Sequence, residues 1–162
     1  MKADEKFYIG TTRFTNETYK ENREWREKHN WSGCMYGLNK RIPKSVPHEA
    51  LIYVLEMNND TNKIEGIGLI RNYINYKQKA YIYKKDPNYN RFIYNSNYRI
   101  DTKEIKNTTY LKVIEILENL IFYGAGHYKR GQGITTINWK KLDEKKKNLF
   151  IIFFKKLFDI KL

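Results

Sequence analysis

The feature that most constrains the fold is a pair of β-branched, apolar segments separated by a short polar one. Residues 50–57 (ALIYVLEM) and 64–70 (IEGIGLI) are rich in side chains favoured in strands, and residues 58–62 (NNDTN) have turn chemistry. This pattern predicts a β-hairpin whose loop has about five residues. We therefore expect an antiparallel strand pair at the centre of a single domain, because 162 residues usually form one.

Other segments carry weaker signals. Short strands are predicted at residues 6–10, 80–83, 91–94 and 98–100. Helices are predicted from Thr15 or Asn16 to about Lys28, from residues 107–109 to Gly124, and over residues 139–162. Residues 30–47, with two prolines and several polar groups, are predicted to form an ordered surface loop. The last helix would place an apolar face on the domain and a lysine-rich face outward, although a basic amphipathic helix can also lie on a membrane surface.

Charge indicates the partner. The chain has 31 Lys and Arg against 18 Asp and Glu, a net charge of +13 that attracts polyanions by releasing their counterions. Nucleic acid, either RNA or DNA, is the expected partner. An alternative source of the charge is genome composition, because Lys, Asn, Ile and Tyr all have AT-rich codons.

Localisation follows from what the sequence lacks. Cys34 has no second cysteine to pair with, and the first residues have no apolar signal region. The longest apolar run, residues 149–154, is too short to cross a bilayer. We expect a soluble, intracellular protein of the cytoplasm or nucleus, including those of a virus-infected host cell, with no membrane partner.

The region from Trp31 to Ile70 resembles a known family. Its motifs are a tryptophan, a glycine, an aromatic residue and an asparagine, followed by the hairpin: Trp31, Gly33, Tyr36, Asn39, and residues 50–57, 58–62 and 64–70. In this respect the chain resembles EVE-type domains of the PUA-like superfamily, whose YTH and ASCH groups share the same barrel. The resemblance implies an α+β fold, a small, strongly curved β-barrel flanked by helices, with a pocket for a nucleobase that is often modified.

The residues of this region offer the parts of a base pocket. Trp31 and Tyr36 would stack on a base, at about 1–3 kcal/mol per ring, unless they are packed in the core instead. Ser32 and Asn39 have donors and acceptors for the polar edge of the base, and Gly33 belongs to the same motif. Two further glycines lie two residues apart in the second hairpin strand and so face one side: Gly66 and Gly68. They leave a bare patch for a ring or ligand, or mark a bend that closes a barrel.

Phosphate contacts are predicted at two places. Arg71 and Asn72 follow the second hairpin strand, where they can meet the phosphate or sugar next to the base. The segment 124–133 (GAGHYKRGQG) frames His127, Lys129 and Arg130 with glycines, so it can hold a phosphate through backbone N–H groups and cations. It lacks the spacing of a nucleotide P-loop, so ATP is not predicted, and an ordinary glycine-rich connection is the alternative.

Two other functions stay open beside a non-catalytic nucleic-acid-binding module. His127 can act as an acid or base next to a phosphate held by Lys129 and Arg130, as in a small nuclease. The carboxylates available to such an enzyme are Glu65, Asp101 and Glu104. The fourteen tyrosines suit a protein-interaction surface equally well. The three histidines have no metal-ligand spacing with one another or with Cys34, so no metal, cofactor or catalytic residue is predicted.

Overall fold

The computed structural model describes residues 7–159. The strands are β1 (Tyr8–Phe14), β2 (Cys34–Leu38), β3 (Leu51–Asn58), β4 (Lys63–Arg71), β5 (Phe92–Ser96), β6 (Arg99–Asp101) and β7 (Ile134–Thr136). The helices are α1 (Asn16–Lys28), α2 (Thr108–Phe122) and α3 (Glu144–Asp159), with short 3-10 turns η1 (Pro87–Asn90), η2 (Thr102–Glu104) and η3 (Trp139–Lys141). No helix among these residues is long and apolar enough to cross a membrane.

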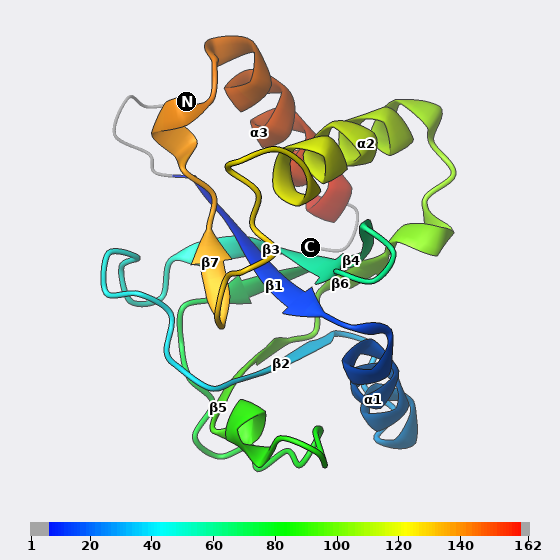
Figure 1. Cartoon of the computed structure of the whole chain (residues 1–162), viewed down its shortest axis with the longest axis vertical. Helices are drawn as coiled ribbons and strands as arrows, with labels where there is room; N and C mark the ends of the chain where they lie inside the picture. The colour runs from blue at the N-terminus through cyan, green and yellow to red at the C-terminus, as the bar shows by residue number, and fades with distance from the viewer. Residues whose placement is uncertain (1–6, 160–162) are drawn as a thin grey trace.

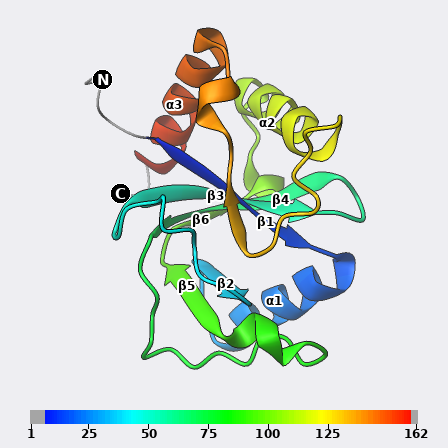
Figure 2. The ribbon, with the colours of Figure 1, turned by 60° about the vertical axis from the view of Figure 1, so that its left-hand side comes forward.

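The molecule has three layers (Figure 1). A five-stranded sheet in the order β6-β4-β3-β1-β7 forms the middle layer, with β1 and β3 parallel and the other pairs antiparallel. Helices α2 and α3 cover one side of this sheet, and the two-stranded sheet β2-β5 lies with α1 on the other side (Figure 2).

The predicted PUA-like barrel is wrong. The described strands form two separate sheets, one of five strands and one of two. The physical reason is that β2 and β5 pair with each other and are attached to the large sheet by side chains. The hydroxyl of Tyr36 on β2 donates to Glu56 on β3 at 2.8 Å, and the hydroxyl of Ser96, the last residue of β5, donates to the carbonyl of Leu69 on β4 at 2.6 Å.

The predicted hairpin is confirmed as β3 and β4, and its strand β3 explains the layering. Tyr53, Leu55 and Met57 pack in the core beneath α2 and α3, whereas Ile52 and Val54 pack in a second core against β2 and β5. Successive side chains of a strand point to opposite faces, so a strand covered on both sides must be apolar throughout. This requirement accounts for the unbroken apolar segment in the sequence.

Of the other predicted elements, two helix starts match the structure and several elements differ from it. Helices α1 and α2 begin at the predicted caps, since the Thr15 side chain accepts from Thr18 N and the Asn107 side chain accepts from Tyr110 N. The strand expected at residues 80–83 is wrong, because this segment has no ladder partner. The region expected to be a loop contains β2, and β7 was not predicted; both are short strands that tertiary contacts hold in place. The predicted helical segment 139–162 starts only at Glu144, and its residues 160–162 lie outside the described residues.

Candidate functional site

The predicted base-pocket residues do not line one open cavity. Trp31 is half-buried, its ring lies 6.5 Å from that of Trp25, and its Nε1 donates to the Cys34 carbonyl at 3.1 Å. Ser32 is exposed, whereas Gly33 is buried so closely against the Ser96 carbonyl that a side chain would not fit. Trp31 therefore packs between α1 and the start of β2, and its indole N–H is already hydrogen-bonded within the protein.

Tyr36 and the two glycines of β4 belong together, but as packing. The side chain of Tyr36 is 2% exposed, and a Cβ added at Gly68 would meet its hydroxyl. A Cβ added at Gly66 would meet the guanidinium of Arg99. The bare patch expected at these glycines is therefore filled by two of the protein's own side chains, and neither a bend nor a ligand is needed to explain it.

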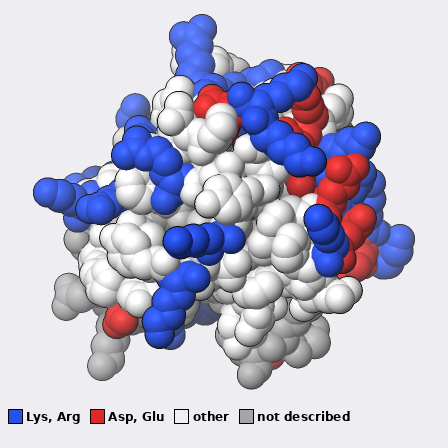
Figure 3. Space-filling view, turned by 90° about the horizontal axis from the view of Figure 1, so that it is seen from below, with Lys and Arg blue, Asp and Glu red and all other residues white. Residues whose placement is uncertain are grey.

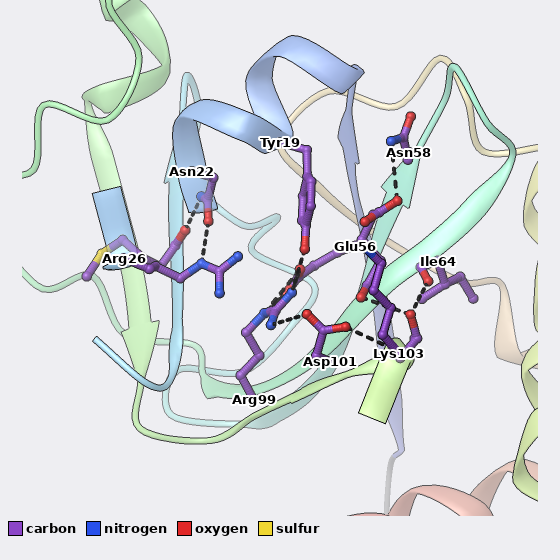
Figure 4. A network of polar contacts seen from close by, with 12 residues as sticks. Tyr19, Asn22, Arg26, Glu56, Asn58, Ile64, Arg99, Asp101 and Lys103 are labelled. Atoms are coloured by element: carbon purple, nitrogen blue, oxygen red, sulfur yellow. Dashed lines mark hydrogen bonds and ion pairs between the residues drawn. The ribbon is translucent and has the colours of Figure 1, made fainter. Parts of the chain in front are cut away.

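A buried ion pair lies at this point between the two sheets (Figure 4). Arg99 donates to both carboxylate oxygens of Glu56, from its terminal nitrogen to Oε1 at 2.8 Å and from Nε to Oε2 at 3.0 Å. The same guanidinium contacts Asp101 at 3.4 Å and the Tyr19 hydroxyl at 3.2 Å. Both side chains of the Glu56–Arg99 pair are at most 5% exposed, so Arg99, which sequence reasoning did not single out, holds β3, β6 and α1 together.

Burial also sets the protonation of the neighbouring groups. Desolvation raises the pKa of the Cys34 thiol to about 11, and together with the charge of Glu56 it raises the pKa of Tyr36 well above its ordinary value. Desolvation likewise raises the pKa of Tyr83. These groups are neutral in the folded protein, so they are packing groups and not nucleophiles.

We expect the protein to lose stability as the pH rises above about 9, because the unfolded chain releases the Cys34 proton near 9.0 while the folded chain retains it to about 11. This contribution is complete below the unfolded pKa and falls by up to about 1.4 kcal/mol per pH unit above it. Urea midpoints measured at pH 8, 9 and 10 test this. Cys34→Ala should have a flatter dependence over the same range, and identical slopes for the two proteins would contradict the expectation.

The remaining predicted site residues of the N-terminal half have structural partners. Asn39 donates to the Gln132 side chain at 3.0 Å. Asn72 donates to the carbonyls of Val46 and Pro47 and so holds the loop before β3. Arg71 is exposed and donates to the Glu49 carbonyl at 3.2 Å, which leaves most of its guanidinium facing solvent.

The glycine-rich loop between α2 and β7 is a hydrogen-bonded turn. The backbone N–H groups of His127, Tyr128 and Gly131 donate to carbonyls within α2 or the loop, and that of Lys129 donates to His127 Nδ1 at 3.2 Å. These N–H groups are therefore not free for a phosphate. The Lys129 ammonium donates to Asn62 Oδ1 at 2.7 Å, and Arg130 is exposed. No carboxylate forms a hydrogen bond or ion pair with His127 among residues 7–159.

Tyr36 also lines a pocket of about 340 Å³ that lies between β1, β2, the start of α1 and η1. We call it the β1–β2 pocket. Its apolar and aromatic walls come from five side chains: Phe14, Tyr36, Leu38, Tyr83 and Tyr89. Gly133, at the end of the glycine-rich loop, also lines it, and Asn59 links the two by donating to the Lys129 carbonyl at 2.9 Å. Tyr36 and the glycine-rich loop, predicted as separate parts of one binding site, thus meet at this pocket.

Two strand edges supply polar groups to the pocket. The hydrogen bond from Ile137 N to the Ile9 carbonyl shows that the odd-numbered residues of β1 turn their peptide groups toward β7. The pairing of β1 with β7 ends at Thr12 and Ile134. The peptide group of Arg13 therefore lies beyond the last pair. On β2, Asn22 of α1 donates to the Met35 carbonyl at 2.7 Å, so the odd-numbered residues of β2 turn their peptide groups away from β5. The peptide group of Gly37, two residues after Met35, therefore faces the edge of β2 that has no strand partner.

Two side chains of the pocket have unused polar groups. Thr12 points from β1 toward β2, and its hydroxyl has no hydrogen-bond partner among residues 7–159. Arg13 also lines the pocket, but its side chain leaves β1 on the face opposite to that of Thr12; it makes no ion pair or side-chain hydrogen bond within the same residues. The acidic side chains at the mouth, in contrast, are engaged: Glu17 pairs with Lys85, Glu21 accepts from Lys84 N, and Asp86 accepts from Asn88 N.

No family model, curated protein or solved structure matches this chain. The pocket residues must therefore be judged by their chemistry alone. Thr12, Leu38 and Tyr89 were missed in the sequence because they become neighbours only through the parallel pairing of β1 with β3 and the position of β2 beneath it. A usable signal was present in α1, where Tyr19, Asn22 and Arg26 recur at helical spacing and form the buried side of the helix.

Proposed function

We propose that the protein binds single-stranded nucleic acid, RNA or DNA, and holds one base in the β1–β2 pocket without catalysing a reaction. The observation that carries this proposal is the pocket itself. Its volume of about 340 Å³ is at the lower end of the range of small-ligand sites, and its walls are aromatic and apolar, with few polar groups. Such a site suits a flat, partly polar ring.

The polar groups of the pocket are of the kind that reads the edge of a base. The Thr12 hydroxyl offers a donor and an acceptor, and the peptide groups of Arg13 and Gly37 offer both as well. A base that leaves its stack is recognised in this way, by hydrogen bonds to its edge and by contact of its faces with aromatic rings. Tyr89, half-buried in η1, is the ring with the most accessible position.

The charges around the pocket support an anionic ligand. At its mouth Glu17 is ion-paired with Lys85, whereas Glu21 and Asp86 accept backbone N–H groups and keep their charge; Arg13 has no ion-pair partner among residues 7–159. Lys40 packs against Gly133, and Arg130 precedes Gly133 in the same loop, so further cations lie close to the pocket in the chain. With a net charge of +13, these groups favour the phosphates of a strand whose base occupies the pocket.

Binding of labelled single-stranded oligonucleotides of each base at about 50 mM salt tests the proposal. We expect Tyr89→Ala to weaken binding about tenfold, because each base–aromatic contact contributes about 1–3 kcal/mol. Thr12→Val should reduce the preference between bases by no more than about tenfold and leave the unfolding midpoint unchanged, since the hydroxyl has no protein partner.

Tyr123→Ala is the matched control, because this exposed tyrosine follows α2 on the opposite side of the sheet. It should bind like the unaltered protein. A protein that binds no oligonucleotide at low salt, or a Tyr89→Ala variant with full affinity and full base preference, would show that the pocket has another ligand.

A further inference from the structure

Two arginines share one aromatic ring at the edge of the small sheet. The guanidinium carbons of Arg41 and Arg91 lie 5.3 and 5.2 Å from the centre of the Phe92 ring. Both arginines are exposed, and neither makes an ion pair within residues 7–159. The two like charges beside the Phe92 ring repel each other. A phosphate bound by both guanidinium groups would offset this repulsion, and the groups would keep their contact with the ring.

A fixed loop next to these arginines displays two tyrosines. The side chain of Asn75 accepts from Lys77 N and Gln78 N, and that of Asn90 accepts from Ile82 N and Tyr83 N. These bonds hold a segment that has no strand partner in a defined shape. Two tyrosines of this segment point into solvent: Tyr76 is 69% exposed and Tyr81 is 78% exposed. Solvent exposure of two large aromatic side chains on an ordered loop is typical of a contact surface.

The tyrosines and the arginines lie along one groove. A depression of about 300 Å³ is lined by Tyr76, Lys79, Tyr81 and Arg91. Arg41 adjoins this groove through the Phe92 ring that it shares with Arg91, and the next residue, Ile42, donates its N–H to the Tyr94 hydroxyl at 3.0 Å. We call the residues Arg41, Tyr76, Lys79, Tyr81, Arg91 and Phe92 the tyrosine–arginine surface.

The charge of this surface has one sign. The chain has no Asp or Glu between Glu65 and Asp86, while Lys77, Lys79 and Lys84 are exposed there. Figure 3 views this end of the molecule: the acidic groups gather mainly on the side where Figure 1 places α1, and many basic groups elsewhere on the face stand apart from them. A partner rich in negative charge and in flat rings is complementary to such a surface.

We infer that the tyrosine–arginine surface is a second nucleic-acid contact, at which Arg41 and Arg91 bind a backbone phosphate and Tyr76 and Tyr81 stack on bases that flank the one in the pocket. This inference rests on the proposed function. The two sites are adjacent, because Leu38 lines the pocket and is the ladder partner of Phe92, and Tyr89 of the pocket precedes Arg91 by two residues. One strand can therefore occupy both.

Strand length and salt separate the two sites. We expect the unaltered protein to bind an eight-nucleotide strand at least tenfold more tightly than a mononucleotide, and Arg41→Ala/Arg91→Ala to lose most of this gain. The double variant should also reduce the slope of log affinity against log salt by about 0.7 for each lost phosphate contact. Tyr76→Ala/Tyr81→Ala should weaken binding of the longer strand by about tenfold or more, with the salt slope unchanged.

The control is Lys103→Ala/Lys112→Ala, which removes two exposed lysines near α2, across the large sheet. It should keep the dependence on strand length. Since all substituted side chains are exposed, each variant should keep the unfolding midpoint. If Tyr89→Ala weakens binding while both tyrosine–arginine variants bind like the unaltered protein, this inference is wrong and the proposed function stands. If no oligonucleotide binds, or if only an acidic polypeptide such as polyglutamate binds and Arg41→Ala/Arg91→Ala abolishes that, nucleic acid is not the ligand of either site.

Discussion

Replacing Arg99 by methionine is expected to destabilise the protein by about 3–5 kcal/mol, because it leaves the Glu56 carboxylate buried without its cation. Glu56 is 2% exposed and would keep only the hydroxyl of Tyr36 as a partner among the contacts described above. The methionine would also leave the Tyr19 hydroxyl without its donor. Urea denaturation of the two proteins at pH 7 measures the difference.

The double variant Glu56→Leu/Arg99→Met separates charge from packing. Exchanging a buried ion pair for apolar side chains of similar size is often neutral, so the double variant should recover much of the stability lost by Arg99→Met. Asp101→Asn is the second control, because Asp101 contacts the same guanidinium from a partly exposed position and should matter far less. An Arg99→Met variant as stable as the unaltered protein would show that the pair does not hold β3 and β6 together in solution.

The Glu56–Arg99 pair also marks the limit of what the sequence reveals. The hairpin was predictable because β3 and β4 are neighbours in the chain and their apolar pattern is local. Arg99 lies 43 residues from Glu56, and nothing near either residue signals the other. Long-range pairs of this kind depend on strand order, which local propensity does not encode.

The glycines of β4 show the same limit: their local pattern was predictable, but the side chains that pack on them were not. Gly66 and Gly68 were correctly placed on one face, because side chains alternate along a strand. What fills that face is set by β2, and β2 was taken for a loop. Tyr36 was therefore assigned to stacking, although its hydroxyl reaches across Gly68 to Glu56. The glycine-rich loop was found from composition, but its proximity to Tyr36 depends on the end of β7 next to β1.

Phe154→Ala is expected to cost about 3–5 kcal/mol of stability, as is usual when a fully buried phenylalanine is truncated. Phe154 lies on α3 and contacts the ring of Tyr53 on β3 at a centroid distance of 5.0 Å. Ile152→Ala is the matched control on the same helix, since Ile152 is 54% exposed and should change stability by less than about 0.5 kcal/mol. Urea midpoints of the two variants at one pH provide the comparison.

This pair of variants also tests how the lysine-rich helix is used. The apolar side chains Phe150, Phe153, Phe154, Leu157 and Phe158 of α3 are all buried against α2 and the sheet. A membrane surface would need the same side chains, so binding to lipid would require α3 to leave the domain. If Phe154→Ala proved no more destabilising than Ile152→Ala, α3 would not be docked in solution. The expected large difference instead leaves the exposed face of α3, with its lysines, for outside contacts, and lysines attract phosphate without selecting a base.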